Sequence, residues 1–195
     1  KFSMALANRG RGLIEYAKAL YDNGHQPVFL RQAHIDLSTG LENGVDPHAI
    51  EVFEQHKVII EEVLSTEYLR DGIDMDGFSL GDSEEERKYR RWCLENQLFQ
   101  NPLNDLKPFP IAAHDCFTVP SMVVDIGEGP TYHGFFNQLK QEFASARFLY
   151  YEGINAEVSH FADKDVMLYN TLDYPVYSLA IEKVKIVFRM SYSLF

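Results

Sequence analysis

The sequence predicts an all-α protein, and three observations support that fold class. Apolar residues recur at spacings of three and four along most of the chain, which is the period of an amphipathic helix. Capping residues and prolines stand where these apolar patterns begin. The 195 residues also include 14 Phe and 11 Tyr, large side chains that a helical core can bury. We therefore expect a helical hairpin, then a loop-rich segment, then long antiparallel helices.

The first two expected helices cover residues 5–23 and 27–42. The first should end at Asn23-Gly24, and the second should open at Pro27, because glycine suits a helix end and proline a first turn. Two short helices joined by a tight turn form a helical hairpin. The pattern also partly resembles a tetratricopeptide unit, but the spacings depart from the 34-residue consensus. A plain hairpin and a tetratricopeptide-like hairpin therefore both stay open.

A third helix is expected over residues 47–69, with Asp46 as its N-cap. Together with the hairpin it makes a first domain, residues 1–70. The Gly/Asp-rich stretch that follows predicts a loop over residues 71–82. Ser83, with a glutamate three positions later, forms a capping box and predicts a helix that runs to about Phe99.

Residues 101–130 contain five prolines, so regular helix is excluded over much of this segment. The apolar stretch 116–124 fits either a short helix or a buried extended segment. Residues 131–152 then predict the clearest helix of the chain, which Gly153 should end. A connector over residues 154–174 leads to a last helix, opened at Pro175.

The last two helices should pack as an antiparallel pair, because each carries an apolar face too wide to stay in water. The stripe of the first includes Phe143, and that of the second includes Phe188. If both rings are buried, replacing either by alanine should cost about 3–5 kcal/mol.

Composition limits which class of protein this chain can belong to and the cellular compartment in which we expect it. The formal net charge is −11, and residues 130–195, with six basic and seven acidic side chains, carry only −1 of it. The acidic remainder disfavours contact with nucleic acid phosphates. Two cysteines cannot build a disulfide framework, and no apolar run reaches the ~18 residues of a membrane span. We expect a soluble cytoplasmic protein without a membrane partner.

Both ends of the sequence suggest that it is a fragment. It begins at Lys1 rather than at methionine, and it stops at Phe195 in the middle of a helical pattern.

No known catalytic or metal-binding pattern is complete. The loop around Asp74-Met75-Asp76-Gly77 resembles a calcium loop but lacks the first and last ligands. The seven histidines and two cysteines have no zinc-site spacing, and phosphate loops, dinucleotide fingerprints and nucleophile elbows are missing. We expect no catalytic, cofactor-binding or metal-binding residue and no cofactor.

Arg147 and Glu182 are unusual because each lies within a strongly apolar helix. Either they form ion pairs at the boundary of the core, or they line a cleft between helices of a bundle.

Four strings in the second half of the chain resemble a bacterial branch of the HEPN superfamily, in which tetratricopeptide-like helices often precede the HEPN domain. They are residues 89–105, which include Tyr-Arg-Arg-Trp-Cys, and residues 145–153, 170–175 and 188–195. The resemblance implies that residues 83–195 are the first part of a truncated HEPN-like helical domain.

The resemblance also implies a function. Many HEPN domains form homodimers and act as metal-independent endoribonucleases in defence, toxin or stress systems. Their motif is an arginine followed after four to six residues by a histidine, which can move a proton at neutral pH. None of the nine arginines here is followed by a histidine at that spacing. We expect the motif beyond Phe195, so that the parent protein cleaves RNA and this fragment does not.

A non-catalytic helical scaffold is the alternative. The acidic N-terminal two-thirds and the aromatic helix faces, which suit partner packing, favour it. The sequence alone leaves open whether the parent protein is an enzyme.

Overall fold

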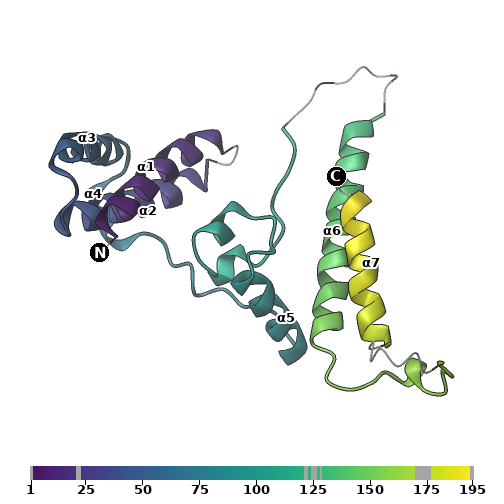
Figure 1. The fold of residues 1–195 in the computed structure, drawn as a ribbon. Helices are drawn as coiled ribbons and strands as arrows, with labels where there is room; N and C mark the ends of the chain where they lie inside the picture. The colour runs from purple at the N-terminus through teal and green to yellow at the C-terminus, as the bar shows by residue number, and fades with distance from the viewer. Residues whose placement is uncertain are drawn as a thin grey trace. The chain divides into compact units, whose positions relative to one another are not determined.

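A computed structural model describes residues 2–20, 23–120, 123, 127, 129–169 and 177–193. These residues form seven α-helices and three short 3-10 helices, with no strand among them (Figure 1). The all-α prediction is therefore confirmed. The chain divides into two compact units, Lys1–Thr118 and Val119–Phe195. Residues 83–118 fall in the first unit, and the predicted division into 1–70 and 83–195 stays a prediction.

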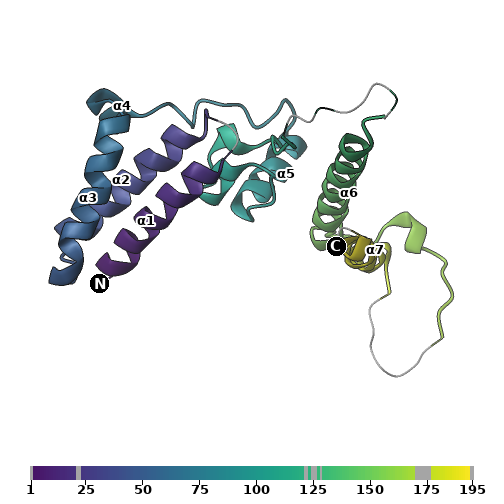
Figure 2. The ribbon, with the colours of Figure 1, turned by 90° about the horizontal axis from the view of Figure 1, so that it is seen from above.

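Three helices of the first unit lie side by side, as Figure 2 shows. The helix predicted at 27–42 is confirmed with its proline in the first turn. The helix predicted at 5–23 ends earlier, because Leu20 is already extended at ψ 135°. The three helices are α1 (Ser3–Ala19), α2 (Gln26–Glu42) and α3 (Pro47–Val63).

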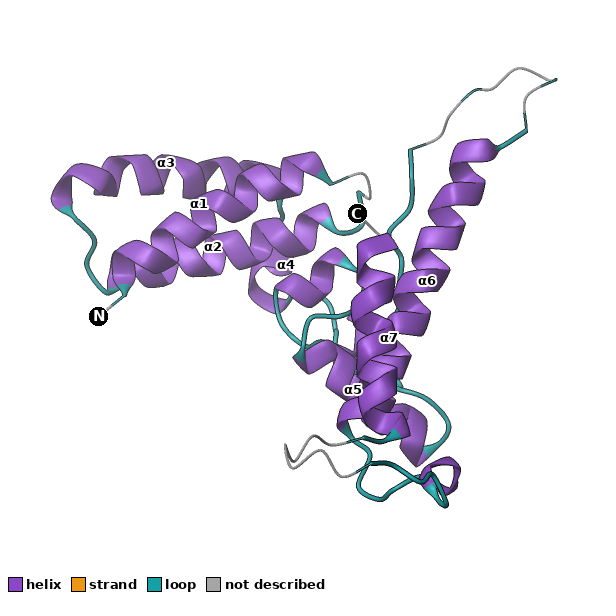
Figure 3. Cartoon of the chain, turned by 45° about the vertical axis from the view of Figure 1, so that its right-hand side comes forward, coloured by secondary structure: helices purple, strands orange, loops and turns teal. Residues whose placement is uncertain are grey.

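α1 and α2 pack against each other as a hairpin (Figure 3). Their contact depends on small residues where the two backbones meet. A Cβ atom on Gly10 would lie 2.9 Å from the carbonyl oxygen of Ala33 and 2.9 Å from Cγ of Leu37. A Cβ on Gly40 would lie 2.9 Å from Cβ of Ala7. The two helices approach so closely because these positions carry no larger side chain.

The single helix predicted over residues 47–69 is wrong, because the chain breaks between α3 and α4 (Thr66–Asp71). Leu64 is extended at ψ 137°. Ser65 then starts the new helix, and its hydroxyl accepts a hydrogen bond from the Tyr68 amide at 3.2 Å. A serine cap inside an apolar pattern was the signal for this break. The Asp46 cap is confirmed by a 2.9 Å hydrogen bond from the His48 amide.

The capping box before α5 (Glu84–Glu95) is also confirmed, since the Ser83 hydroxyl accepts from the Glu86 amide at 3.0 Å. The helix stops before the predicted Phe99, because Gln97 takes a left-handed φ of 54°. The buried Asn104 then closes this end of the helix. Its amide donates to the Leu94 carbonyl at 2.9 Å, which replaces a lost helical partner.

The core of the first unit has two parts. One joins α1, α2 and α3, and its fully buried members are Ala7, Ala33, Leu37 and Ile60. The other joins the hairpin to α5 and to the short helices η1 (Pro102–Asp105) and η2 (Pro110–Ala112). Its most buried members are Ala17, Phe29, Cys93, Leu94 and Ala112.

In the second unit, α6 (Thr131–Ile154) and α7 (Leu179–Ser193) pack as an antiparallel pair (Figure 1). Gly153, expected to end the first of them, instead lies inside it. A Cβ there would sit 2.9 Å from Cγ2 of Val184 and 3.0 Å from the Ala180 carbonyl oxygen. The glycine therefore marks a close helix approach rather than a stop. The predicted start at Pro175 lies outside the described residues.

Phe188 was expected in the core, and the structure contradicts this, because its side chain is 63 % exposed. α7 turns Ala180 and Val184 toward α6, which leaves the ring outside, in an edge contact with Tyr192 at 5.1 Å between centroids. Phe143 is half-buried. The predicted stripe was thus rotated relative to the face that packs.

Replacing Phe188 by alanine should therefore change the free energy of unfolding of this chain by less than about 1 kcal/mol, since exposed substitutions rarely do more. Chemical denaturation followed by circular dichroism at low protein concentration measures this. A loss near the 3–5 kcal/mol of a buried ring would show that the exposed position is wrong.

Across the part of the chain that the structure describes, no helix has the length and apolar character needed to cross a bilayer.

Candidate functional site

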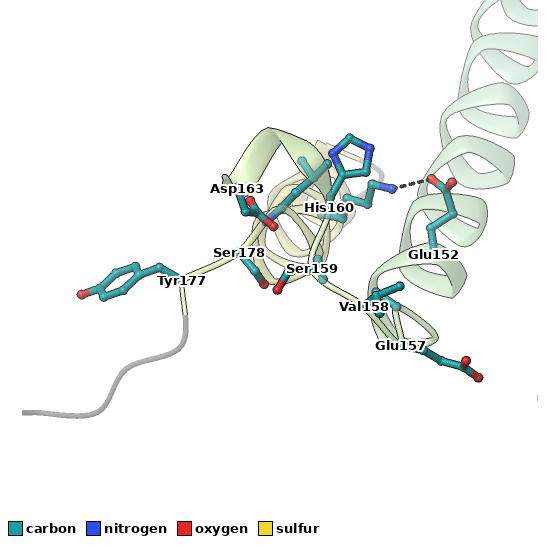
Figure 4. A pocket seen from close by; sticks show the side chains of 12 residues that line it. Glu152, Glu157, Val158, Ser159, His160, Asp163, Tyr177 and Ser178 are labelled. Atoms are coloured by element: carbon teal, nitrogen blue, oxygen red, sulfur yellow. Dashed lines mark hydrogen bonds and ion pairs between the residues drawn. The ribbon is translucent and has the colours of Figure 1, made fainter. Parts of the chain in front are cut away.

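A pocket of about 310 Å³ lies where α6 ends, the connector follows and α7 begins. Figure 4 shows that its side chains come from these three segments. The polar lining residues are Glu152, Glu157, Ser159, His160, Asp163, Tyr177, Ser178 and Lys183.

The first turn of α7 is held in place by two side chains of the pocket. The Asp163 carboxylate accepts a hydrogen bond from the Leu179 amide at 2.8 Å, and the Ser178 hydroxyl accepts from the Ile181 amide at 3.3 Å. Both contacts satisfy amides that a helix start leaves unpaired. A carboxylate at this end also interacts favourably with the helix dipole. Asp163 and Leu179 are 16 residues apart in the sequence, so their hydrogen bond joins the connector to the start of α7.

His160 is oriented by its own turn. Its Nδ1 accepts a hydrogen bond from the Ala162 amide at 3.1 Å at the start of the 3-10 helix η3 (Phe161–Asp163). This contact fixes the orientation of the imidazole ring at the edge of the pocket. The ring also lies 4.1 Å from that of Phe161 between centroids.

One ion pair crosses the pocket from helix to helix. Nζ of Lys183 on α7 lies 3.0 Å from Oε2 of Glu152 on α6 (Figure 4). The two side chains are 22 % and 37 % exposed, so water screens the pair and its net contribution is about 1 kcal/mol or less. Its main effect is to direct the lysine toward a carboxylate and away from an incoming anion.

The charge of the pocket is negative. The lining includes three carboxylates, Glu152, Glu157 and Asp163, and one lysine, Lys183. Asp163 also has a second carboxylate oxygen that is buried without a hydrogen-bond partner. Such a site repels phosphate and favours hydrogen-bond donors or cations. The charge of the lining therefore disfavours an RNA backbone as the ligand of this pocket.

The two unusual charged residues have different surroundings. Glu182 accepts a hydrogen bond from Lys185 of its own helix at 2.7 Å, with both side chains 48 % exposed. For Glu182, this contact agrees with the first of the two alternatives, an ion pair at the boundary of the core. Arg147 is only 9 % exposed, and its guanidinium carbon lies 5.6 Å from the centre of the Phe143 ring. It is a buried cation stacked on an aromatic face.

Asp115 and Asp74, the first residue of the Asp74-Met75-Asp76-Gly77 string, both accept hydrogen bonds from backbone amides. The Asp115 carboxylate accepts from the Gln100 amide at 2.8 Å, and Asp74 accepts from the amides of Asp76 and Gly77 at 2.9 and 3.0 Å. Within the described ranges, no group of three or more His, Cys, Asp or Glu side chains is placed to hold a metal ion.

Sequence reasoning did not single out the pocket at the base of α6 and α7. Its residues come from three segments, and none belongs to a motif with a known spacing. The one usable signal was local: a serine just before the apolar pattern of the last helix, which is typical of an N-cap.

The family model of the LA2681-like HEPN domain matches residues 123–195. This range contains α6, α7 and three of the four strings that carried the resemblance, while residues 89–105 lie outside it. The resemblance to the HEPN superfamily is confirmed for residues 123–195, and the tetratricopeptide-like hairpin stays a prediction. No curated protein matches the chain, and no solved structure matches it.

Proposed function

We propose that this chain is part of a cytoplasmic HEPN-type protein that cleaves RNA without a metal ion in a bacterial defence, toxin or stress system. The observation that carries the proposal is the family match over residues 123–195, where the structure has an antiparallel pair of helices. The helices of the first unit would act as a sensing or docking module.

The expected chemistry needs an arginine and a histidine close together. The guanidinium holds the phosphate bidentately and offsets charge in the transition state, while the imidazole moves the proton of the RNA 2′-hydroxyl. Residues 1–195 contain no such pair at the required spacing, and the polar pocket of α6 and α7 carries the wrong charge for phosphate. In this proposal these residues supply the scaffold of the enzyme.

Exposed rings on α6 and α7 support dimerisation as part of the same proposal. Tyr132 and Phe135 are 71 % and 62 % exposed on α6, and Phe188 and Tyr192 are 63 % and 70 % exposed on α7. Aromatic side chains of this size are enriched at protein interfaces. A second copy that covers them would form the homodimer typical of HEPN domains.

Cleavage assays test the proposal. The complete product of the gene and residues 1–195 alone are each incubated with labelled single-stranded RNA, or with DNA of the same sequence, in excess EDTA. We expect the complete product to cut RNA, to spare DNA because DNA has no 2′-hydroxyl, and to lose activity when the histidine of an Arg-x4–6-His motif is replaced by alanine. Residues 1–195 should be inactive.

An inactive complete product, or one whose cleavage needs a divalent ion, would refute the proposal. Inactivity would favour the second candidate function, a non-catalytic helical scaffold. The negative pocket and the formal net charge of −11 support that alternative, because neither attracts RNA.

A further inference from the structure

The first unit has an open groove between α2 and α3, outside the residues that match the HEPN family model. The groove measures about 380 Å³. Its walls are faces of α2 and α3, which are 17 residues long each, or about 25 Å. The side chains that line it are Ser38, Leu41 and Glu42 on α2 and Glu54, Lys57, Val58 and Glu61 on α3.

Exposed apolar side chains extend the groove along α2 and α3, beyond the seven residues that line it. Val58 on its α3 wall is 50 % exposed, and Ile50, two turns earlier on the same face, is 39 % exposed. On α2, Ile35 lies one turn before Ser38 and is 37 % exposed. Spacings of three, four and seven place these residues on the groove side of their helices. The groove therefore offers an apolar strip to a partner.

The carboxylates along the strip are largely unneutralised. Glu42 and Glu54 are exposed, and within the described residues neither forms an ion pair. Glu61 accepts from His34 at 2.9 Å and lies 3.7 Å from Lys57. The hydrogen bond from His34 lowers the pKa of Glu61, so this carboxylate is charged at neutral pH. With one lysine against three glutamates, the groove is negative.

We propose that this groove binds a basic amphipathic helix of a partner protein. An apolar stripe on the partner would cover Ile35, Ile50 and Val58, and its lysines or arginines would meet Glu42 and Glu54. This is the arrangement of a helix held in a groove by anchors at helical spacing. The negative charge of the groove disfavours RNA as the occupant, because RNA is also negative. It also disfavours a second copy of this chain in a two-fold contact, which would place glutamates opposite glutamates.

A peptide titration tests the groove. The probe is a fluorescein-labelled 18-residue helical peptide with leucine at every third or fourth position and lysine on the flanks, and a second peptide carries glutamate in place of each lysine. Fluorescence anisotropy with the whole chain should show binding of the lysine peptide alone. The double variant Glu42→Lys with Glu54→Lys should weaken it at least tenfold.

The matched control is Glu85→Lys with Glu95→Lys on α5, which changes the net charge equally at two exposed glutamates of the same unit. This variant should change the affinity less than threefold. Equal losses in the two variants would mean that overall charge attracts the peptide, and the groove proposal would fall. It would also fall if neither peptide binds, or if sedimentation shows that the groove variant breaks a dimer of the chain.

Discussion

Replacing Phe29 by alanine should lower the free energy of unfolding of the first unit by about 3–5 kcal/mol, the range measured for fully buried rings. Phe29 is 0 % exposed on α2 and belongs to the core that joins the hairpin to α5. Its ring also meets that of Tyr16 edge-on, with 5.1 Å between centroids. The substitution removes a ring from the core that joins α1, α2 and α5, and these helices cannot fully close the cavity that it leaves.

The measurement is a urea titration followed by the fluorescence of Trp92, the one tryptophan of the sequence, which packs against the same core. Phe78→Ala is the control, because that ring is 50 % exposed in a loop and should change stability by well under 1 kcal/mol. Equal losses in the two variants would show that Phe29 does not occupy the centre of this core.

Local signals in the sequence predicted the helices well where a capping residue and the apolar period agreed. Asp46 and Ser83 both start helices as expected. The failures have a common physical cause. Leu64 and Gln97 leave helical geometry within stretches whose apolar pattern continues. Polar contacts hold the chain at these two places: the Ser65 cap after Leu64 and the Asn104 amide on the Leu94 carbonyl. Periodicity alone cannot show where a chain turns without interrupting its apolar pattern.

The packing faces were harder to predict than the helices. A stripe of large rings through Phe188 suggested the buried side of the last helix, yet the structure buries the side with Ala180 and Val184 against α6. Small residues allow two backbones to approach closely, whereas rings hold them apart. Gly153 was the sequence signal for that face, although it was predicted to end the helix. The pocket at the base of the pair could not be predicted, because it exists only once three segments meet.

Gly153→Ala should destabilise the α6–α7 pair by about 1–3 kcal/mol, the usual cost of overpacking. The added methyl would lie 3.0 Å from the Ala180 carbonyl oxygen, a backbone atom that cannot move without shifting α7. The measurement is amide hydrogen exchange in α6 and α7, where the protection factors should fall by about tenfold or more.

Gly134→Ala on the same helix is the matched control, since a Cβ there meets nothing within 4 Å. Alanine favours helix over glycine by up to about 1 kcal/mol, so this variant should hold or raise protection. The opposite signs of the two effects separate packing from helix propensity. If both variants raised protection, α6 and α7 would not be in close contact at Gly153. The helix pair that underlies the ribonuclease proposal would then lose its structural support, while the family match over residues 123–195 would stand.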